Sequence, residues 1–246
     1  MEVGLKIRRK KLSDCLAIIP ARGGSKRIPK KNIKNFLSQP IIKYSIDAAI
    51  NSSCFKEIMV STDDKEIAEI SISGGAKVPF LRSMQTSNDF ATTADVLEEV
   101  FTEYKKRGVN FDYCCCIYPT APFISGQRII EGFNLLETSD ADSVVPVVCF
   151  AYPIQRAFKI ENGYLSMIWP ENLKKRSQDF IPTYHDCGQF YWMRVERFLK
   201  NHSVFTNNSL AMILSEKEVE DIDNEEDWER AEMKFRINQQ MRRHER

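Results

Sequence analysis

A basic, glycine-containing stretch at residues 20–32 has the residue types needed to bind a polyphosphate. Two adjacent glycines, Gly23 and Gly24, let backbone amides turn inward as an anion-binding nest, and nearby cations neutralise phosphate oxygens. The stretch carries five cations: Arg22, Lys26, Arg27, Lys30 and Lys31. It has neither P-loop nor G-x-G-x-x-G spacing. It predicts a cradle for a nucleoside triphosphate, and the alternative is a solvated basic turn.

Two carboxylates near the other end of the chain are suited to the metal ion that accompanies a triphosphate. Asp221 and Asp223 are two residues apart in an expected extended segment, so both face one side while Ile222 faces the core. Paired hard oxygen ligands opposite a triphosphate suit Mg²⁺. Alternatively, these acids are only helix-start residues that the helix dipole favours. That alternative explains the acids at 225–227 better than it explains Asp221 and Asp223. We therefore predict Mg²⁺ binding by Asp223 first and Asp221 second.

The elements that must position these groups follow a strand-helix alternation. The expected order is strand 15–19, helix 40–50, strand 57–61, a helix capped by residues 62–64 and ended by Gly74-Gly75, and strand 77–81. Then follow a helix from Thr92 to Lys106, strand 112–118, helix 125–137 and strand 143–149. This order predicts parallel strands with the ligand at their C-terminal ends.

The alternation is interrupted after residue 151. Residues 158–160 and 164–168 flank Glu161-Asn162-Gly163, which is a strong hairpin signal. We predict that residues 152–180 are an inserted arm, whose exposed aromatic side chains require burial against a second subunit. The predicted core comprises the remaining two blocks, 15–151 and 181–246, and residues 1–14 form a basic N-terminal arm.

Composition restricts the classes of partner. The 246 residues include 35 lysines and arginines against 34 acids, which does not predict nucleic-acid binding. No apolar run approaches the ~20 residues of a membrane span, and the N-terminus lacks the apolar core of a secretion signal. The seven cysteines contain no C-x-x-C pair, which predicts reduced, mostly buried thiols in a cytoplasmic protein and argues against zinc.

Five segments, in the same order along the chain, resemble the cytidylyltransferases that activate sialic acids and related nonulosonic acids. The resemblance covers roughly residues 15 to 235, and its segments are P-A-R-G-G-S-K-R-I-P-x-K-N at 20–32, R-x-x-x-L-x-x-D at 82–89, Q-P-T-S-P at 118–122, R-Q-x-x-P-x-x-y-x-x-N-G-x-x-Y within 176–191, and the D-I-D at 221–223. It implies an α/β, three-layer nucleotidyltransferase (Rossmann-like) fold, with a mostly parallel sheet and an antiparallel dimerisation arm. It also implies CTP and a nine-carbon sugar acid as substrates, Mg²⁺ as cofactor and a homodimer.

The resemblance assigns roles residue by residue. Catalytic roles fall on Arg22, Lys31 and Asp223. Nucleotide contacts fall on Ala21, Arg22, Gly23, Gly24, Ser25, Lys26, Lys31, Asn32, Arg82, Asp89, Thr93, Pro119 and Thr120. Sugar contacts fall on Tyr118, Arg156, Arg176, His185, Gln189 and Tyr191.

Departures from the family pattern bear on the sugar. Tyr118 replaces the glutamine usual in sialic acid synthetases, Cys187 replaces an asparagine and Thr86 replaces a leucine. Tyr118, together with H-D-x-G-Q-F-Y-W at 185–192, is similar to the pseudaminic acid branch. The expected reaction converts CTP and pseudaminic acid to CMP-pseudaminic acid and pyrophosphate, for surface glycan or flagellin glycosylation. Synthesis of CMP-N-acetylneuraminic or CMP-legionaminic acid, a nucleotide-sugar glycosyltransferase and a non-catalytic nucleotide-sugar-binding protein remain alternatives.

Overall fold

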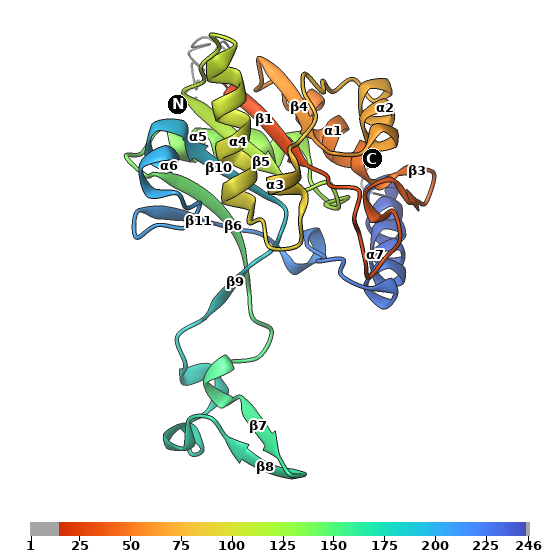
Figure 1. Ribbon diagram of the computed structural model, residues 1–246. Helices are drawn as coiled ribbons and strands as arrows, with labels where there is room; N and C mark the ends of the chain where they lie inside the picture. The colour runs from red at the N-terminus through yellow and green to blue at the C-terminus, as the bar shows by residue number, and fades with distance from the viewer. Residues whose placement is uncertain (1–14, 245–246) are drawn as a thin grey trace, which may run out of the picture.

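A seven-stranded sheet forms the centre of the protein, whose computed structural model describes residues 15–244 (Figure 1). The predicted basic arm at 1–14 lies outside the described residues. The sheet order is β11-β6-β10-β5-β1-β4, and β9 pairs with β6. Its strands are β1 (Cys15–Pro20), β4 (Glu57–Ser61), β5 (Tyr113–Ile117), β6 (Ser143–Cys149), β9 (Tyr184–Asp186), β10 (Phe190–Arg194) and β11 (Ser209–Ile213).

Most of this sheet is parallel. Strand β1 pairs in parallel with β4 and with β5, so that Ile18 lies opposite Met59 on one side and Cys116 on the other. Strand β10 is antiparallel to β5 and β6, and β11 is parallel to β6. The predicted α/β, mostly parallel nucleotidyltransferase architecture is therefore confirmed.

Helices cover both faces of the sheet. They are α1 (Ile41–Ser52), α2 (Lys65–Ser73), α3 (Met84–Ser87), α4 (Thr93–Lys106), α5 (Gly126–Glu137), α6 (Val195–Asn201) and α7 (Glu225–His244). Alternate residues of β1 pack against the helices on opposite faces of the sheet, as expected for a strand that is buried on both faces. Ala17 and Ile19 pack in one apolar cluster with α1 and α5. Leu16 and Ile18 pack in another with α4 and α6.

A third apolar cluster anchors the C-terminal helix α7. Trp228 of α7 packs with Phe36, Ile41 and Ile222, and Ile222 is 1% exposed. The prediction that Ile222 faces the core is confirmed. Because Ile222 is fixed, the neighbouring aspartates on the same extended segment are fixed too. The loop before α1 forms the short hairpin β2 (Asn35–Phe36) and β3 (Gln39–Pro40).

Two local predictions were wrong. Residues 77–81 do not form a strand, since only Lys77 makes an isolated bridge to Met59. Pro79 has no N–H to donate to a ladder, which explains why the pairing stops. The next parallel strand beside β1 is instead β5. The predicted polar loop at 82–89 contains the single-turn helix α3.

The segment at 152–180 lies away from the sheet (Figure 1). It carries the predicted hairpin, β7 (Phe158–Glu161) and β8 (Tyr164–Met167), turned by Asn162 at φ 51° and Gly163 at φ 84°. Positive φ at both central residues is the two-residue hairpin geometry that Asn-Gly favours. Short 3₁₀ turns complete the described chain: η2 (Lys31–Ile33), η3 (Ile154–Arg156), η4 (Pro170–Asn172), η5 (Ser177–Asp179) and η6 (Glu216–Glu218).

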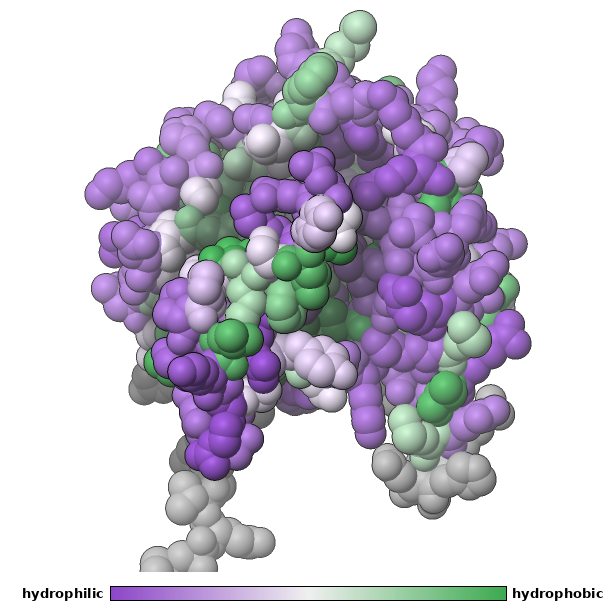
Figure 2. All heavy atoms as spheres, turned by 90° about the horizontal axis from the view of Figure 1, so that it is seen from below, coloured by the Kyte–Doolittle hydropathy of each residue, from purple (hydrophilic) through white to green (hydrophobic). Residues whose placement is uncertain are grey.

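The arm exposes many apolar side chains. Six of them are Tyr152, Phe158, Ile160, Tyr164, Leu165 and Leu173. Figure 2 looks from below, with the arm of Figure 1 projecting toward the viewer, and shows apolar side chains gathered near the centre of this face. Among the helices of the described chain, none is both long and apolar enough to cross a membrane.

Candidate active site

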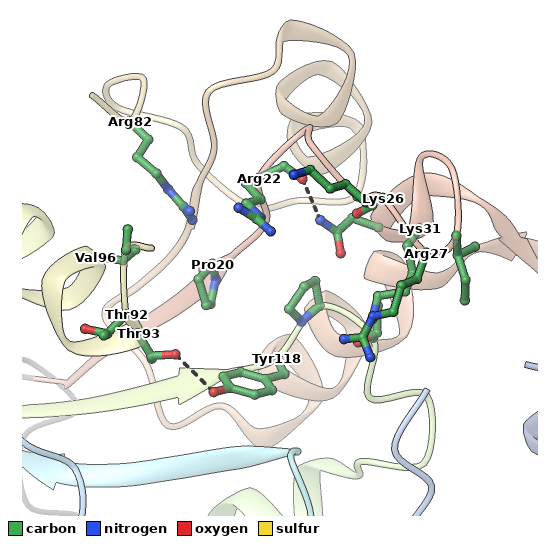
Figure 3. Close-up of a pocket in the computed structure, with 16 residues that line it drawn as sticks. Pro20, Arg22, Lys26, Arg27, Lys31, Arg82, Thr92, Thr93, Val96 and Tyr118 are labelled. Carbon is green, nitrogen blue, oxygen red and sulfur yellow. Dashed lines mark hydrogen bonds between the residues drawn. The ribbon is translucent and has the colours of Figure 1, made fainter. Parts of the chain in front are cut away.

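A cavity of about 440 Å³ opens at the C-terminal ends of β1 and β5 (Figure 3). Its walls come from the basic loop after β1, the start of α4 and the loop after β5. The predicted residues that line it are Arg22, Ser25, Lys26, Lys31, Asn32, Arg82, Thr93, Tyr118, Pro119 and Thr120. Ten predicted side chains from four separate sequence segments thus converge on one cavity, at the sheet edge where open α/β sheets bind ligands.

The glycines of the basic loop do not form the predicted nest. Neither Gly23 nor Gly24 has positive φ, so the alternation that turns successive amides inward is absent there. The Gly23 amide instead donates to Asp63 Oδ1 at 3.0 Å. A Cβ on Gly23 would lie 2.7 Å from Asp64 Oδ2, so glycine is required for close approach. Gly24 has open space around it, and Ala21 is buried.

Two side chains connect the basic loop to the rest of the site. Buried Asn32 donates through Nδ2 to the Arg22 carbonyl at 2.9 Å, which fixes the loop's curvature. Lys31 Nζ donates to the Ile222 carbonyl at 2.6 Å and lies 3.8 Å from Asp223 Oδ1. Burial lowers the pKa of Lys31, and the negative charge of Asp223 partly offsets that effect. The predicted phosphate loop and the predicted metal segment are therefore in direct contact.

Arg82 is held at the cavity by β4. Arg82 is 8% exposed, and its guanidinium donates from Nε to Ser61 Oγ at 3.0 Å and from Nη2 to the Ser61 carbonyl at 2.6 Å. Burial lowers its pKa to about 10. Figure 3 shows the guanidinium directed toward Arg22 and the cavity between them. A buried cation facing an open cavity is suited to an anionic or carbonyl-bearing ligand.

Tyr118 and Thr93 form one wall of the cavity. Thr92 caps α4 in a capping box with Asp95, and the next residue, Thr93, hydrogen-bonds through Oγ1 to the Tyr118 hydroxyl at 3.0 Å. The Tyr118 ring meets Tyr191 edge to face, with centroids 5.5 Å apart. Tyr118, predicted to contact the sugar, therefore lies in the same cavity as the predicted nucleotide contacts.

Asp221 and Asp223, the predicted metal ligands, lie beside the cations of the basic loop. Arg27 Nη2 lies 2.8 Å from Asp223 Oδ1, the same oxygen that Lys31 approaches. Burial, and next the charge of Asp223, raise the pKa of Asp221. Within residues 15–244 no cluster of three or more histidines, cysteines, aspartates or glutamates could hold a metal ion alone. Two carboxylates with substrate phosphates and water complete a Mg²⁺ site, so the residues fit this ion.

The predicted sugar residues other than Tyr118 lie outside the main cavity. Gln189 is buried and donates through Nε2 to the Glu218 carbonyl, so it packs rather than lines the cavity. The Tyr191 hydroxyl donates to Asp186 Oδ2 at 2.6 Å. His185 packs on Phe150 and lines a second cavity of about 330 Å³ beside Asp221. Tyr191 is buried because it lies in β10, between β5 and β6, and Gln189 is buried immediately before that strand.

Arg156 and Arg176 lie on the arm. Arg156 Nη1 is 3.3 Å from Ser177 Oγ, and Arg176 pairs with Asp179 at 3.0 Å, three residues away. Neither arginine lines the main cavity or the second cavity. The structure of one chain therefore does not bring these two predicted sugar contacts to the site, because the arm extends away from the sheet (Figure 1).

Two site residues were not predicted. Asp63 binds the Gly23 amide, and Ser61 holds Arg82. Arg27 was predicted as a cation of the basic loop, but its pairing with Asp223 was not. The T-D-D sequence after β4 was interpreted only as a helix cap, and Asp64 does cap α2 through the amides of Glu66 and Ile67. A cap needs only one of the two aspartates, so the additional one, Asp63, was the available signal.

The fold and the site together define a nucleotidyltransferase, and comparisons with known proteins specify the family. The family model described as cytidylyltransferase matches residues 16–241, and the chain belongs to this cytidylyltransferase family. The chain is 38% identical over 224 residues to a pseudaminic acid cytidylyltransferase of Campylobacter jejuni, covering 91% of this chain and 97% of the relative. It is 30% identical to a CMP-N,N'-diacetyllegionaminic acid synthase of Legionella pneumophila, covering 92% of this chain and 97% of the relative.

The solved structures agree on the fold. A CMP:2-keto-3-deoxy-manno-octonic acid synthetase complexed with CTP superposes with a TM-score of 0.66 at 17% identity, covering 92% of this chain and 100% of that chain. At this identity the similarity concerns the fold alone. It confirms the predicted nucleotidyltransferase sheet independently of sequence motifs.

Proposed function

We propose that this protein is a Mg²⁺-dependent cytidylyltransferase that joins CTP to a nonulosonic acid, giving the CMP-sugar and pyrophosphate. The observation that carries the proposal is the cavity in which Arg22, Lys26 and Arg82 face the start of α4 and the loop after β5. The cytidylyltransferase relatives, which span almost the whole chain, support CTP as the nucleotide.

The proposed mechanism relies on positioning and charge. The anomeric hydroxyl of the sugar attacks the α-phosphorus in line, and pyrophosphate leaves. Arg22, Ser25, Lys26 and Lys31 hold the β- and γ-phosphates and stabilise the departing pyrophosphate. Asp223 and Asp221 would hold Mg²⁺, which would supply positive charge to neutralise the phosphate oxygens. Phosphoryl transfer of this kind needs no strong protein base, and no residue is assigned that role.

Pseudaminic acid is the proposed sugar. The Campylobacter relative named for this sugar is 38% identical, compared with 30% for the legionaminic acid synthase. Tyr118, which stands where sialic acid synthetases usually carry glutamine, lies in the main cavity, and His185 lines the neighbouring cavity beside Asp221. A sialic or legionaminic acid is the second candidate.

We further propose a homodimer formed through the arm. Ile160 and Tyr164 on β7 and β8 are 72% and 81% exposed, which favours burial against a second copy. In such a dimer Arg156 and Arg176 of one chain would reach the sugar site of the other. The two arginines could then contact the sugar although they lie away from the cavity of their own chain. A planar guanidinium fork suits the carboxylate of a sugar acid.

We place the reaction in the cytoplasm, where CTP is available, as a step that supplies an activated sugar for surface glycan or flagellin glycosylation. The mostly buried cysteines, including Cys114, Cys115 and Cys116, are compatible with a reducing compartment.

The test is pyrophosphate release with CTP and Mg²⁺, offering pseudaminic, legionaminic and N-acetylneuraminic acids in parallel. We expect release with pseudaminic acid, and loss of release when Mg²⁺ is chelated. Release only with N-acetylneuraminic acid would retain the chemistry and contradict the sugar assignment. No release with any sugar, together with retained CTP binding, would favour a nucleotide-sugar-binding protein instead.

A further inference from the structure

The cations predicted to bind the β- and γ-phosphates are already paired with a carboxylate. Arg22 Nη1 lies 2.9 Å from Asp89 Oδ1, and Lys26 Nζ donates to Asp89 Oδ2, so one aspartate bridges both cations. Arg22 Nη1 also donates to the Asn88 carbonyl at 2.9 Å. The partners lie far away in sequence: Asn88 is 66 positions from Arg22, and Asp89 is 63 positions from Lys26. The positive charges of these two cavity-lining cations are therefore neutralised by a distant segment.

Asp89 is presented to the basic loop by a turn of defined shape. It lies between α3 and α4, and its neighbour Asn88 accepts hydrogen bonds through Oδ1 from the amides of Phe90 and Ala91 at 2.8 and 3.0 Å. Ala91, two residues beyond Asp89, lines the cavity. The carboxylate thus reaches Arg22 and Lys26 from the opposite wall of the cavity, where a phosphate chain would also have to approach them.

The ion pairs of Asp89 with Arg22 and Lys26 are weak enough for a phosphate to replace them. The side chains of Asp89 and Lys26 are 41% and 77% exposed, and exposed ion pairs are weak and screened by salt. Phosphate oxygens form charge-assisted hydrogen bonds with the same donors, and a polyphosphate carries several charges against the single charge of Asp89. A triphosphate therefore displaces Asp89, while Asp89 regains its partners once pyrophosphate is lost.

We propose that Asp89 is a placeholder anion that occupies the β/γ-phosphate subsite between turnovers and promotes release of pyrophosphate. The carboxylate competes with the phosphates of CTP and of pyrophosphate for Arg22 and Lys26. It does not compete with CMP, which lacks those phosphates. The inference rests on the proposed function for the identity of the ligands, but binding of inorganic pyrophosphate tests it without any sugar or turnover.

The test compares the full-length chain with its Asp89→Asn variant by calorimetry, using inorganic pyrophosphate, CTP and CMP in turn. We expect Asp89→Asn to bind pyrophosphate and CTP about fivefold more tightly, the effect of removing one exposed competitor from two cations. CMP binding should change by less than about twofold. In steady state the KM for CTP and kcat should fall together, with stronger inhibition by pyrophosphate.

A matched control is Glu66→Gln on α2, which removes one carboxylate that pairs with a different cation of the same basic loop. Glu66 pairs with Lys30 at 2.5 Å, and Lys30 does not line the cavity. Pyrophosphate affinity of Glu66→Gln should equal that of the wild type. Weaker or unchanged pyrophosphate binding by Asp89→Asn would overturn the inference and make Asp89 a residue that orients Arg22. If the wild type binds pyrophosphate but no CTP, the proposed function fails while the Asp89 result still stands.

Discussion

The nucleotide side of the site and the arm differ in how their charged groups are held. In the core, Lys31 binds the Ile222 carbonyl and Arg82 binds Ser61 in buried surroundings, with partners 191 and 21 positions away. On the arm, Arg176 is 72% exposed and its partner Asp179 is only three residues away. Lys31 and Arg82 are fixed by the tertiary structure of one chain, whereas Arg176 is fixed only locally.

This difference indicates which half of the reaction one chain can perform. A preorganised site holds its charged groups in place before the substrate arrives, and the core meets that condition. The arm carries exposed apolar side chains such as Ile160 and Leu165, together with Arg176, whose partner Asp179 is three residues away. Exposed apolar side chains of this kind are typical of a surface that becomes covered in an assembly. We therefore expect nucleotide binding to survive changes on the arm, and sugar transfer to require the arm.

The largest expected effect is that of Asp223→Asn. Loss of this metal ligand should lower turnover by about a thousandfold, because charge on the transferring phosphate is no longer neutralised. CTP binding measured with EDTA present should remain. Glu225→Gln is the matched control, since Glu225 pairs with Lys34 at 2.5 Å on the same segment. Equal turnover of Asp223→Asn and the wild type would remove the metal role.

The second effect tests the arm. Introducing charges by Ile160→Asp and Leu165→Asp should produce a monomer whose turnover is lower by about a hundredfold, because the sugar is no longer positioned. CTP affinity of the double variant should remain at the wild-type value. Sedimentation velocity and calorimetry measure the two properties separately. A dimeric, fully active double variant would contradict the proposed role of these side chains.

The third effect is confined to the core. Arg82→Lys loses the paired contacts to Ser61 and should weaken CTP binding by about tenfold, the value expected for a lost hydrogen bond of a charged group. The dimer should be unaffected. Titration of CTP into the variant checks this, and unchanged affinity would place Arg82 outside the ligand contacts.

The smallest effect concerns the stability of α4, whose first turn borders the cavity. Thr92→Ala removes the N-cap and should lower the free energy of unfolding by about 1 kcal/mol at neutral pH. Hydrogen bonds from the backbone and side chain of Thr92 lower the pKa of Asp95. The stabilisation from Asp95 is therefore fully present above the ordinary aspartate range and is lost as pH falls through the lowered pKa. Urea unfolding at neutral and acid pH should show the difference between the variants shrinking in acid.

Local patterns in the sequence predicted the elements whose signals are short-range. The hairpin turn at Asn162-Gly163 and the cap of α2 were predicted, because each is set by a few adjacent residues. The prediction of a strand at 77–81 was wrong because it relied on the apolar pattern and did not consider that Pro79 interrupts strand pairing. Helix α6 and strand β11 were not predicted at all.

Contacts between segments that are distant in the sequence could not be predicted from it. The amide of Gly23 binds Asp63, 40 positions away, and no local pattern indicates that the glycine serves close approach rather than positive φ. Tyr191 and Gln189 match the family motif, yet Tyr191 is buried within β10 and Gln189 is buried just before that strand. The distance of Arg176 from the cavity likewise follows from the course of the arm and not from its motif.

The central claim is that core and arm are two halves of one site supplied by two chains. The most direct measurement is complementation between Asp223→Asn and Arg176→Ala, each inactive alone, after co-expression. Random pairing should restore about a quarter of wild-type pyrophosphate release, since about one site in four then has both an intact core and an intact arm. Absence of any recovery in verified mixed dimers would show that both halves act within the same chain and would contradict the account.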